Sequence, residues 1–316
     1  MAAAGNDVTV LARGAHFRAI KSNGLRLETN DAKLDVVARV RAIADLKDAP
    51  DIDVVMVTLK AYQVAPIVES LAPIAARARI YMPIQNGVSW WYFQRHGGPR
   101  DGAIVKAVDP DGLLAANLPA AATIPAFAFK SAQVVAPGVV RHIADPSDHI
   151  AMGELDGSDT ERMRSFCADL QHSGIATKVG DVRDLMWHKL LGNVFANPLC
   201  ALTRRVLGDV LQCAPTRALA LDLMHEVSSV AAALGHKPKV SFEDRLKRAQ
   251  AMSAAKPSML QDLEAGRPME IDAILGALVE LAQVTQVDVP IVRTLHACLR
   301  LVELQNASQA LGESRP

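Results

Sequence analysis

Three polar residues recur at intervals of four within an otherwise apolar stretch, residues 185–199. Lys189, Asn193 and Asn197 would lie along one face of a helix, because residues four apart are neighbours on successive turns. A cation and two amides are costly to bury without partners, so the stripe either faces solvent or lines an internal cleft. In a cleft, Lys189 could act as a general acid with a pKa lowered by desolvation, or as a fixed cation beside a carbonyl oxygen.

A second polar cluster spans residues 256–272 and contains Ser258 and Glu270. Glu270 lies where a helix is predicted to begin, and a carboxylate at that position is stabilised by the helix dipole even if it has no other role. A functional role would require Ser258 and Glu270 to face the polar stripe of residues 185–199. Both interpretations stay open at the level of the sequence.

Two basic residues, Arg13 and Lys60, come directly after apolar runs that are predicted strands. In doubly wound sheets, ligands bind at the carboxyl ends of the strands. An acidic residue after the second strand would bind the ribose 2′-hydroxyl of NAD, whereas an arginine suits the 2′-phosphate of NADP. No carboxylate follows Arg13 until Glu28, so the pattern favours NADP. The alternative is that Arg13 and Lys60 are ordinary solvated residues.

The elements that must position these residues divide the chain into two parts. Residues 1–180 contain short, nearly continuous apolar runs, which are typical of strands covered on both faces. We predict strands at 7–12, 53–59, 79–84, 127–135, 139–142, 150–155 and 176–179, a hairpin over 103–116, and helices at 64–76 and 160–171. Five further helices are predicted at 181–202, 215–234, 242–255, 271–286 and 290–305.

The predicted architecture is therefore α/β followed by all-α. Residues 1–180 would form a Rossmann-type, doubly wound domain in which Arg13 favours NADP, and residues 181–316 a helical domain in which Lys189 could act as a general acid. The helices at 271–286 and 290–305 could be the contact surface of a homodimer or simply part of the core.

Composition restricts the function further. The 34 basic residues balance the 34 acidic ones, so no overall field attracts nucleic acid or an anionic membrane. No window of 18 uncharged apolar residues predicts a membrane span, and the first residues lack the basic region of a signal peptide. The four cysteines are scattered without a CxxC pair, which indicates reduced thiols and a cytoplasmic protein. No metal site is predicted.

Taken together, seven segments resemble the ketopantoate reductases (2-dehydropantoate 2-reductases), and the resemblance extends from about residue 5 to residue 303. The segments are VTVLARG at 8–14, VTLKAYQV at 57–64, QNGV at 85–88, APGVVRH at 136–142, GELDG at 153–157, WHKLLGNVFANPLCALT at 187–203 and SMLQDLEAGRPMEID at 258–272. The resemblance implies NADPH-dependent reduction of ketopantoate, a small 2-oxo acid, to pantoate, a step toward pantothenate and coenzyme A.

The resemblance also implies roles for individual residues. Lys189 would be the general acid for the carbonyl oxygen, and Glu270 would orient Lys189 and the substrate hydroxyl. Arg13 would bind the 2′-phosphate, Lys60 would bind near the cofactor, and Asn86 would lie where cofactor and substrate meet. The residues expected to bind substrate are Asn193, Asn197 and Ser258.

Two departures from the family pattern stand out. The fingerprint G-x-G-x-x-G and the strand before it are absent, so we expect a misassigned start, with about 15–20 upstream residues that encode this strand and loop. The aromatic run Trp90–Phe93, followed by an insertion at 98–122, would be either a hydrophobic plug or a wall that reshapes the substrate pocket. The substrate therefore stays open, as do a related β-hydroxyacid or opine-type dehydrogenase and a truncated, non-catalytic remnant.

Overall fold

The computed structural model describes residues 1–31, 34–237 and 240–312. Its contacts divide the chain into two compact units. The first unit comprises Met1–Leu59, Pro66–Gln85 and Ala116–Val182, and the second comprises Lys60–Ala65, Asn86–Ala115 and Arg183–Pro316. Two short segments of the N-terminal half thus belong to the helical unit, which the sequence did not indicate. The domain boundary after residue 180 stays a prediction.

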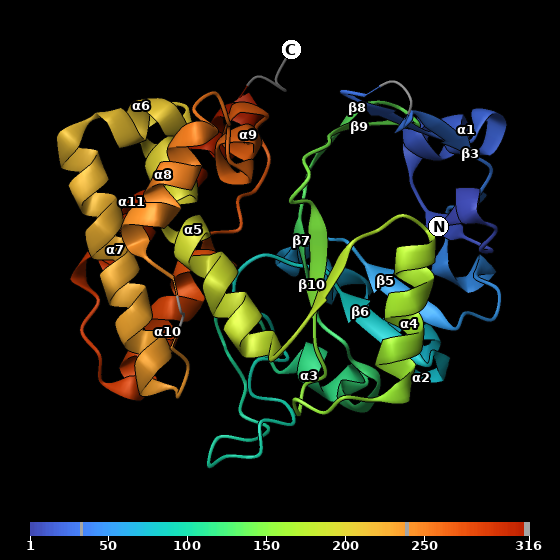
Figure 1. Ribbon diagram of the computed structural model, residues 1–316, viewed down its shortest axis with the longest axis horizontal. Coiled ribbons are helices and arrows are strands. Elements are labelled where there is room, and N and C mark those ends of the chain that lie inside the picture. The colour runs from blue at the N-terminus through green and yellow to red at the C-terminus, as the bar shows by residue number, and fades with distance from the viewer. Residues whose placement is uncertain (32–33, 238–239, 313–316) are drawn as a thin grey trace. The chain divides into compact units, whose positions relative to one another are not determined.

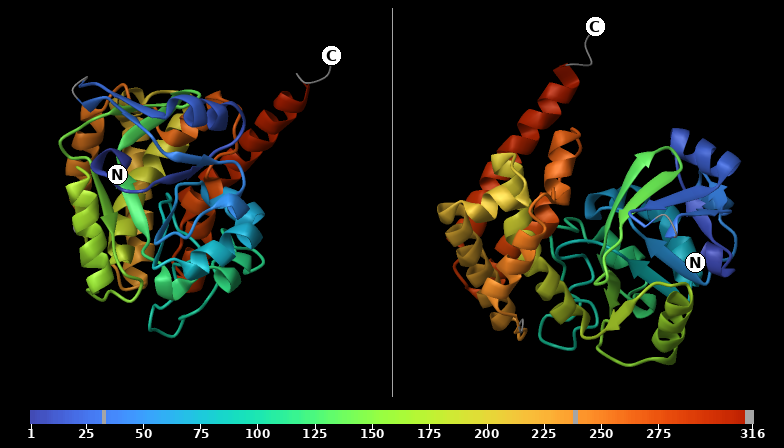
Figure 2. Two further views of the ribbon diagram at one scale, coloured as in Figure 1. Left: turned by 90° about the vertical axis from the view of Figure 1, so that its right-hand side faces the viewer. Right: turned by 45° about the horizontal axis from the view of Figure 1, so that its top comes forward.

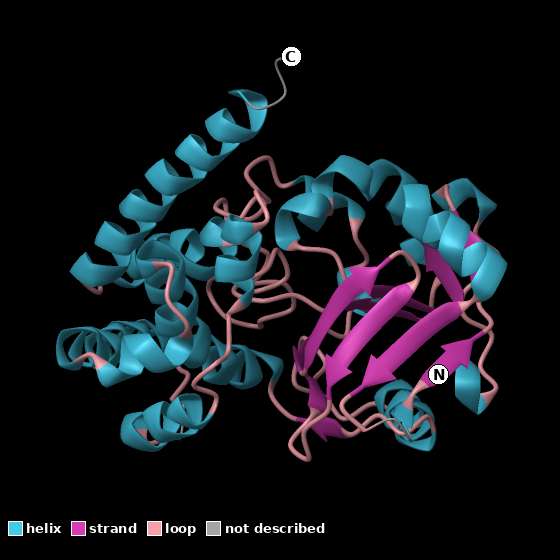
Figure 3. Ribbon diagram, turned by 90° about the horizontal axis from the view of Figure 1, so that it is seen from above, coloured by secondary structure: helices cyan, strands magenta, loops and turns pink. Residues whose placement is uncertain are grey.

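All the strands of the described chain lie in the first unit, where Figure 3 shows them in magenta. Strands β5 (Val54–Val57) and β6 (Ile80–Pro83) run parallel, with Val54 opposite Ile80, and α2 (Val68–Arg77) connects them. This confirms the predicted βαβ unit. All four residues of β6 are buried, as expected for a strand covered on both faces.

Strand β1 (Thr9–Leu11) pairs in parallel with β4 (Arg41–Ile43) and leads into α1 (Gly14–Asn23). Within the described residues, the β1–β4 pair and the β5–β6 pair form separate two-stranded sheets. A doubly wound sheet would join two such pairs through a central strand.

Antiparallel pairing completes the first unit. Strand β10 (His149–Met152) lies between β7 (Ala126–Phe129) and β11 (Thr177–Val179), and α4 (Glu161–His172) contributes Met163, Phe166 and Leu170 to the same core cluster as Ile150 and Met152. A second sheet has the order β3-β2-β9-β8. Its strands are β3 (Val36–Ala38), β2 (Leu25–Thr29), β9 (Val139–Ile143) and β8 (Ser131–Ala136). The single strand predicted at 127–135 is therefore two strands, β7 and β8, which belong to different sheets.

The hairpin predicted over 103–116 is wrong. The segment forms turns followed by the short helix α3 (Leu113–Asn117). Asp109 is buried, and its carboxylate accepts hydrogen bonds from the backbone amides of Leu114 and Ala115 at 3.0 and 2.9 Å. The turn residues thus cap a helix instead of closing a hairpin.

The second unit is built from helices. They are α5 (Val182–Thr203), α6 (Leu207–Gln212), α7 (Ala214–Ala233), α8 (Phe242–Ala251), α9 (Ser258–Glu264), α10 (Ala277–Thr285) and α11 (Pro290–Gly312). Figure 1 shows α7 and α11 side by side. The predicted helix at 271–286 contains a π-helical turn, η7 (Asp272–Gly276), before α10. Figure 2 shows α11 running past the other helices of its unit. No helix in the described part of the chain is both long and apolar enough to cross a membrane.

The aromatic run at 90–93 forms part of the core of the second unit. Trp90, Trp91, Tyr92 and Phe93 are each at most 3% exposed. The Tyr92 hydroxyl accepts a hydrogen bond from the indole Nε1 of Trp187 on α5 at 3.1 Å, and the two rings meet edge to face. The structure therefore supports the hydrophobic plug and not the pocket wall.

Candidate active site

Lys189, Asn193 and Asn197 lie on α5, as their spacing predicts. Most neighbouring positions on this helix are buried, whereas Lys189 and Asn193 are partly exposed and Asn197 is 4% exposed. An amphipathic surface helix would expose these polar residues fully. The stripe is instead half-buried, which disagrees with a solvated surface, and the internal cleft stays a prediction.

Burial changes the acidity of Lys189. Desolvation lowers its pKa to about 8, and the negative charge of Glu270 partly offsets this effect. Removing an ammonium from water disfavours its charged form, so the burial of Lys189 lowers its pKa. Such a lysine gives up its proton near neutral pH, as a general acid requires.

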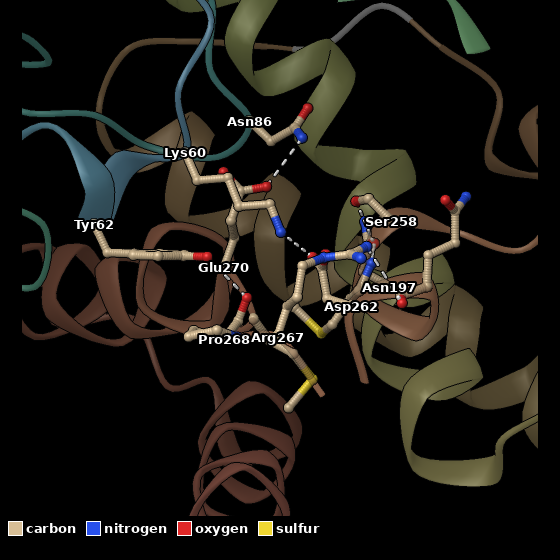
Figure 4. Close-up of polar contacts among 12 residues, drawn as sticks. Lys60, Tyr62, Asn86, Asn197, Ser258, Asp262, Arg267, Pro268 and Glu270 are labelled. Carbon is tan, nitrogen blue, oxygen red and sulfur yellow. Dashed lines mark hydrogen bonds and ion pairs between the residues drawn. The ribbon is translucent and has the colours of Figure 1, made fainter. Parts of the chain in front are cut away.

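Glu270 is 6% exposed and directly precedes the helical segment that contains η7. Its Oε2 atom accepts a hydrogen bond from Nδ2 of Asn86 at 3.2 Å (Figure 4). Burial raises the pKa of Glu270, while the Asn86 hydrogen bond and the charge of Lys60 oppose that rise. A solvated first-turn acid would have no such partners, so Glu270 belongs to a polar cluster with Asn86 and Lys189.

Asn197 and Ser258 contact each other where α9 begins. The hydroxyl of Ser258 donates to Oδ1 of Asn197 at 3.2 Å, and the backbone amide of Met259 donates to the same oxygen at 3.1 Å (Figure 4). Asn197 thus fixes the first turn of α9 and, with it, the position of Ser258.

Asn193 presents a donor without an acceptor. Its Nδ2 atom is buried and has no hydrogen-bond partner among the residues that the structure describes. An unsatisfied buried donor costs on the order of 1–3 kcal/mol, and such an atom on the same helix as Lys189 is the arrangement expected of a group that binds a ligand oxygen.

Lys60 follows β5 and belongs to the second unit. Its ammonium forms an ion pair with the carboxylate of Asp262 on α9 (Figure 4). The other oxygen of Asp262 pairs with Nε of Arg267 at 3.0 Å. Tyr62, two residues after Lys60, donates its hydroxyl to the carbonyl of Pro268 at 3.1 Å. The segment Lys60–Ala65 is therefore tied to the 262–268 region at two points.

Arg13 belongs to the first unit. It is exposed and immediately precedes α1, and the first turn of α1 carries no acidic residue. Among the predicted site residues, the structure thus brings together Asn86 with Glu270 and Asn197 with Ser258, all in the second unit. Arg13 belongs to the first unit and follows β1.

Comparison with known proteins gives these residues a family. A model described as "Ketopantoate reductase PanE/ApbA" matches residues 1–94, and its counterpart for the C-terminal part, "Ketopantoate reductase PanE/ApbA C terminal", matches residues 181–303. A 2-dehydropantoate 2-reductase of Mesorhizobium japonicum is 36% identical over 297 residues, which cover 94% of this chain and 89% of that protein. The chain belongs to the ketopantoate reductase family.

Further relatives and solved structures are similar to this chain over nearly its whole length. A 2-dehydropantoate 2-reductase of Halobacterium salinarum is 27% identical over 95% of this chain and 93% of its own length. The crystal structure of 2-dehydropantoate 2-reductase from Geobacter metallireducens superposes with a TM-score of 0.80 at 26% identity, covering 98% of this chain and 93% of that one. A D-mandelate dehydrogenase in complex with NADH and anilino(oxo)acetate has a TM-score of 0.79 over 96% of this chain and 93% of its own, at 17% identity, which shows a common fold.

In this ketopantoate reductase family member, sequence reasoning missed three charged residues near the site. Asp262 pairs with Lys60, and Arg267 pairs with the other oxygen of Asp262. Arg245 on α8 donates to the backbone carbonyl of His188 on α5 at 2.6 Å. Asp262 lies four residues after Ser258, a spacing that places both on one face of α9 and could have identified it. In the structure the Arg245 guanidinium packs against Gly192, where a Cβ would lie 2.8 Å from it.

Proposed function

We propose that the chain is an NADPH-dependent 2-dehydropantoate 2-reductase, which reduces ketopantoate to pantoate on the way to pantothenate and coenzyme A. Family membership and the named activities of the relatives support the reaction class. The observation that carries the proposal is Lys189, a poorly hydrated ammonium with a pKa of about 8 that experiences the charge of Glu270.

In the proposed reaction, a hydride adds to the keto carbon of the 2-oxo acid and a proton adds to its carbonyl oxygen, giving a 2-hydroxy acid. The nicotinamide supplies the hydride when it is bound. Lys189 donates the proton, because negative charge develops on the carbonyl oxygen and an ammonium beside it can both stabilise and neutralise that charge.

The other polar residues of the second unit would orient Lys189 and the substrate. Glu270, held by Asn86, stabilises the charged form of Lys189. The unpaired Nδ2 of Asn193 is suited to a substrate oxygen. Ser258, held by Asn197, contributes a hydroxyl that can bind the substrate hydroxyl or carboxylate.

NADPH is the proposed cofactor because of Arg13. Its position at the end of β1, its exposure, and the absence of an acid from the first turn of α1 fit a 2′-phosphate better than a free 2′-hydroxyl. Lys60 is proposed to bind near the cofactor. Because an ammonium has three donors and Asp262 engages one side of it, Lys60 can also bind an anionic group.

Steady-state kinetics test the proposal. We expect the highest kcat/KM for ketopantoate with NADPH among a panel of 2-oxo acids tested with both nicotinamide cofactors. A kcat/KM for ketopantoate no better than for unrelated 2-oxo acids would refute the substrate, and an equal preference for NADH would refute the role of Arg13.

We also propose a role for each domain and an oligomeric state. Residues 1–180 would form the NADP-binding domain and residues 181–316 the catalytic domain, in a cytoplasmic protein whose four cysteines are free. A homodimer is proposed through α11, because Leu301 and Leu304 on this helix are 59% and 63% exposed. Light scattering should show a dimer that Leu301→Glu disrupts, while the control Leu34→Glu, at an exposed leucine of the first unit, does not; a monomeric wild type would contradict this assembly.

A further inference from the structure

The helical segment after Glu270 has an unusual backbone. Over Asp272–Gly276 it adopts a π-helical turn. The backbone N–H of Ala277 donates to the carbonyl of Asp272, five residues back, instead of to the carbonyl of Ala273, four residues back. The Ala273 carbonyl accepts a hydrogen bond from the backbone N–H of Val88 at 2.8 Å. The π turn therefore binds the loop that carries Asn86.

Gly87 allows this contact. Its φ of +74° lies in the left-handed region, where a side chain is disfavoured. A Cβ at this position would lie 2.2 Å from the carbonyl oxygen of Ala273 and 2.5 Å from its carbonyl carbon. Both the conformation and the close approach therefore require glycine, and any side chain would push the loop away from the π turn.

The two flanking residues complete a two-point attachment. Val88 holds the loop to Ala273 through its backbone, and Asn86 holds it to Glu270 through its side chain at 3.2 Å. We propose that the π turn is a positioning element, which sets the register of the Asn86–Val88 loop so that Asn86 bonds the Glu270 carboxylate and fixes its position relative to Lys189. This inference rests on the proposed function of Lys189 and Glu270.

The attachment has a measurable electrostatic consequence. The Asn86 hydrogen bond lowers the pKa of Glu270 against the effect of burial, and the charge of Glu270 raises the pKa of Lys189. If the loop moves off the π turn, Glu270 loses this hydrogen bond and holds its proton more tightly. A Glu270 carboxylate that Asn86 no longer holds in place raises the pKa of Lys189 less, so this pKa falls below its value of about 8 in the wild type.

Two glycine variants isolate the contact. Gly87→Ala introduces a side chain at φ +74° against Ala273, whereas Gly97→Ala does so at φ +73° in the same segment with nothing within 4 Å. The pKa of Lys189 is measured from the pH dependence of its acetylation, followed by mass spectrometry. We expect a lowered pKa and a loss of about 10²-fold in kcat/KM in Gly87→Ala alone. Equal behaviour of the two variants would overturn the proposal.

A double-mutant comparison tests whether Gly87 affects the pKa of Lys189 through the Asn86 hydrogen bond. Gly87→Ala made in an Asn86→Ala background should leave the pKa of Lys189 where Asn86→Ala alone puts it, because both changes remove the same hydrogen bond. Additive shifts would overturn the proposal. If Gly87→Ala does not fold, hydrogen exchange in the wild type replaces it: the Val88 amide should exchange far more slowly than the Gly97 amide, and equal rates would overturn the attachment.

These measurements separate the inference from the proposed function. Acetylation and hydrogen exchange require no turnover. A wild type that reduces no 2-oxo acid but shows the Gly87→Ala shift would refute the reductase and retain the positioning element. An active reductase without that shift would retain the function and refute the positioning element.

Discussion

Proton donation by Lys189 predicts a pH dependence in a range where an ordinary lysine would not titrate. With a pKa of about 8 instead of 10.5, Lys189 is about 90% protonated at pH 7 and about 10% protonated at pH 9. The reductive kcat/KM should therefore be level below pH 8 and fall about tenfold for each further pH unit. The oxidation of the 2-hydroxy acid needs a neutral lysine, so its kcat/KM should rise with pH up to about pH 8 and be level above it.

The assay is the rate of NADPH oxidation with ketopantoate between pH 6 and 10, with the oxidative reaction measured in parallel. Lys189→Met should reduce kcat by about 10²–10⁴-fold and abolish the fall in kcat/KM above pH 8. A wild-type kcat/KM that stays level to pH 9.5 would refute the assignment of Lys189 as proton donor. So would a fall in kcat/KM above pH 8 that persists in Lys189→Met.

Burial of the charged Lys189 also lowers the free energy of unfolding, and the size of this effect depends on pH. The unfolded lysine has the higher pKa, so between pH 8 and 10.5 the unfolded state binds more protons and the free energy of unfolding rises with pH. The difference corresponds to at most roughly 3 kcal/mol, reduced by the partial exposure of the side chain. Lys189→Met should therefore melt at a higher temperature than the wild type at pH 7, and the difference should shrink toward pH 10.5. A lower Tm at pH 7 would contradict the poorly hydrated environment.

Four further changes have distinct readouts. Arg13→Ala should reduce the ratio of NADPH to NADH affinity measured by titration, without changing Tm, because the side chain is exposed. Asn193→Leu removes an unpaired buried donor, so it should raise the KM for the 2-oxo acid about tenfold and leave the urea midpoint unchanged or higher. Asp262→Asn leaves Lys60 without its carboxylate and should cost about 1–3 kcal/mol in urea unfolding. Trp91→Ala should cost about 3–5 kcal/mol in the same assay, and a negligible cost would contradict its place in the core.

Those parts of the fold that depend on local patterns could be predicted from the sequence. Continuous apolar runs identified β5 and β6, and helical periodicity identified α5, α7 and α11. The short strands β2, β3 and β4 were missed, because three to five residues carry too little periodicity. The hairpin prediction was wrong for a different reason. Asp109 and its neighbours do form a turn, but the structure on either side of it depends on tertiary hydrogen bonds. Among these are the bonds from the amides of Lys106 and Ala107 to Glu280.

For the candidate site, too, only the features that depend on local sequence could be predicted. The spacing of Lys189, Asn193 and Asn197 is local, so the sequence could predict their common face. The bond from Asn86 to Glu270 spans 184 positions, and that from Lys60 to Asp262 spans 202. No pattern within one helix or loop encodes such pairs. The π turn is also invisible in the sequence, since Asp272–Gly276 has the composition of an ordinary helix.

The charges gathered in the second unit bear on which substrate the proposed reductase would accept. Lys60, Arg267 and Lys189 supply three cations, and Asp262 and Glu270 supply two carboxylates. With Lys189 protonated and Glu270 ionised, the group carries one net positive charge, which complements a monocarboxylate such as a 2-oxo acid and disfavours a cationic substrate. Once Lys189 has given up its proton, the group is neutral while the product keeps its negative charge. The site therefore binds the product less tightly than the substrate until Lys189 regains a proton from water. This reprotonation is favourable below pH 8, so the rate of turnover depends on the same pKa as the chemical step.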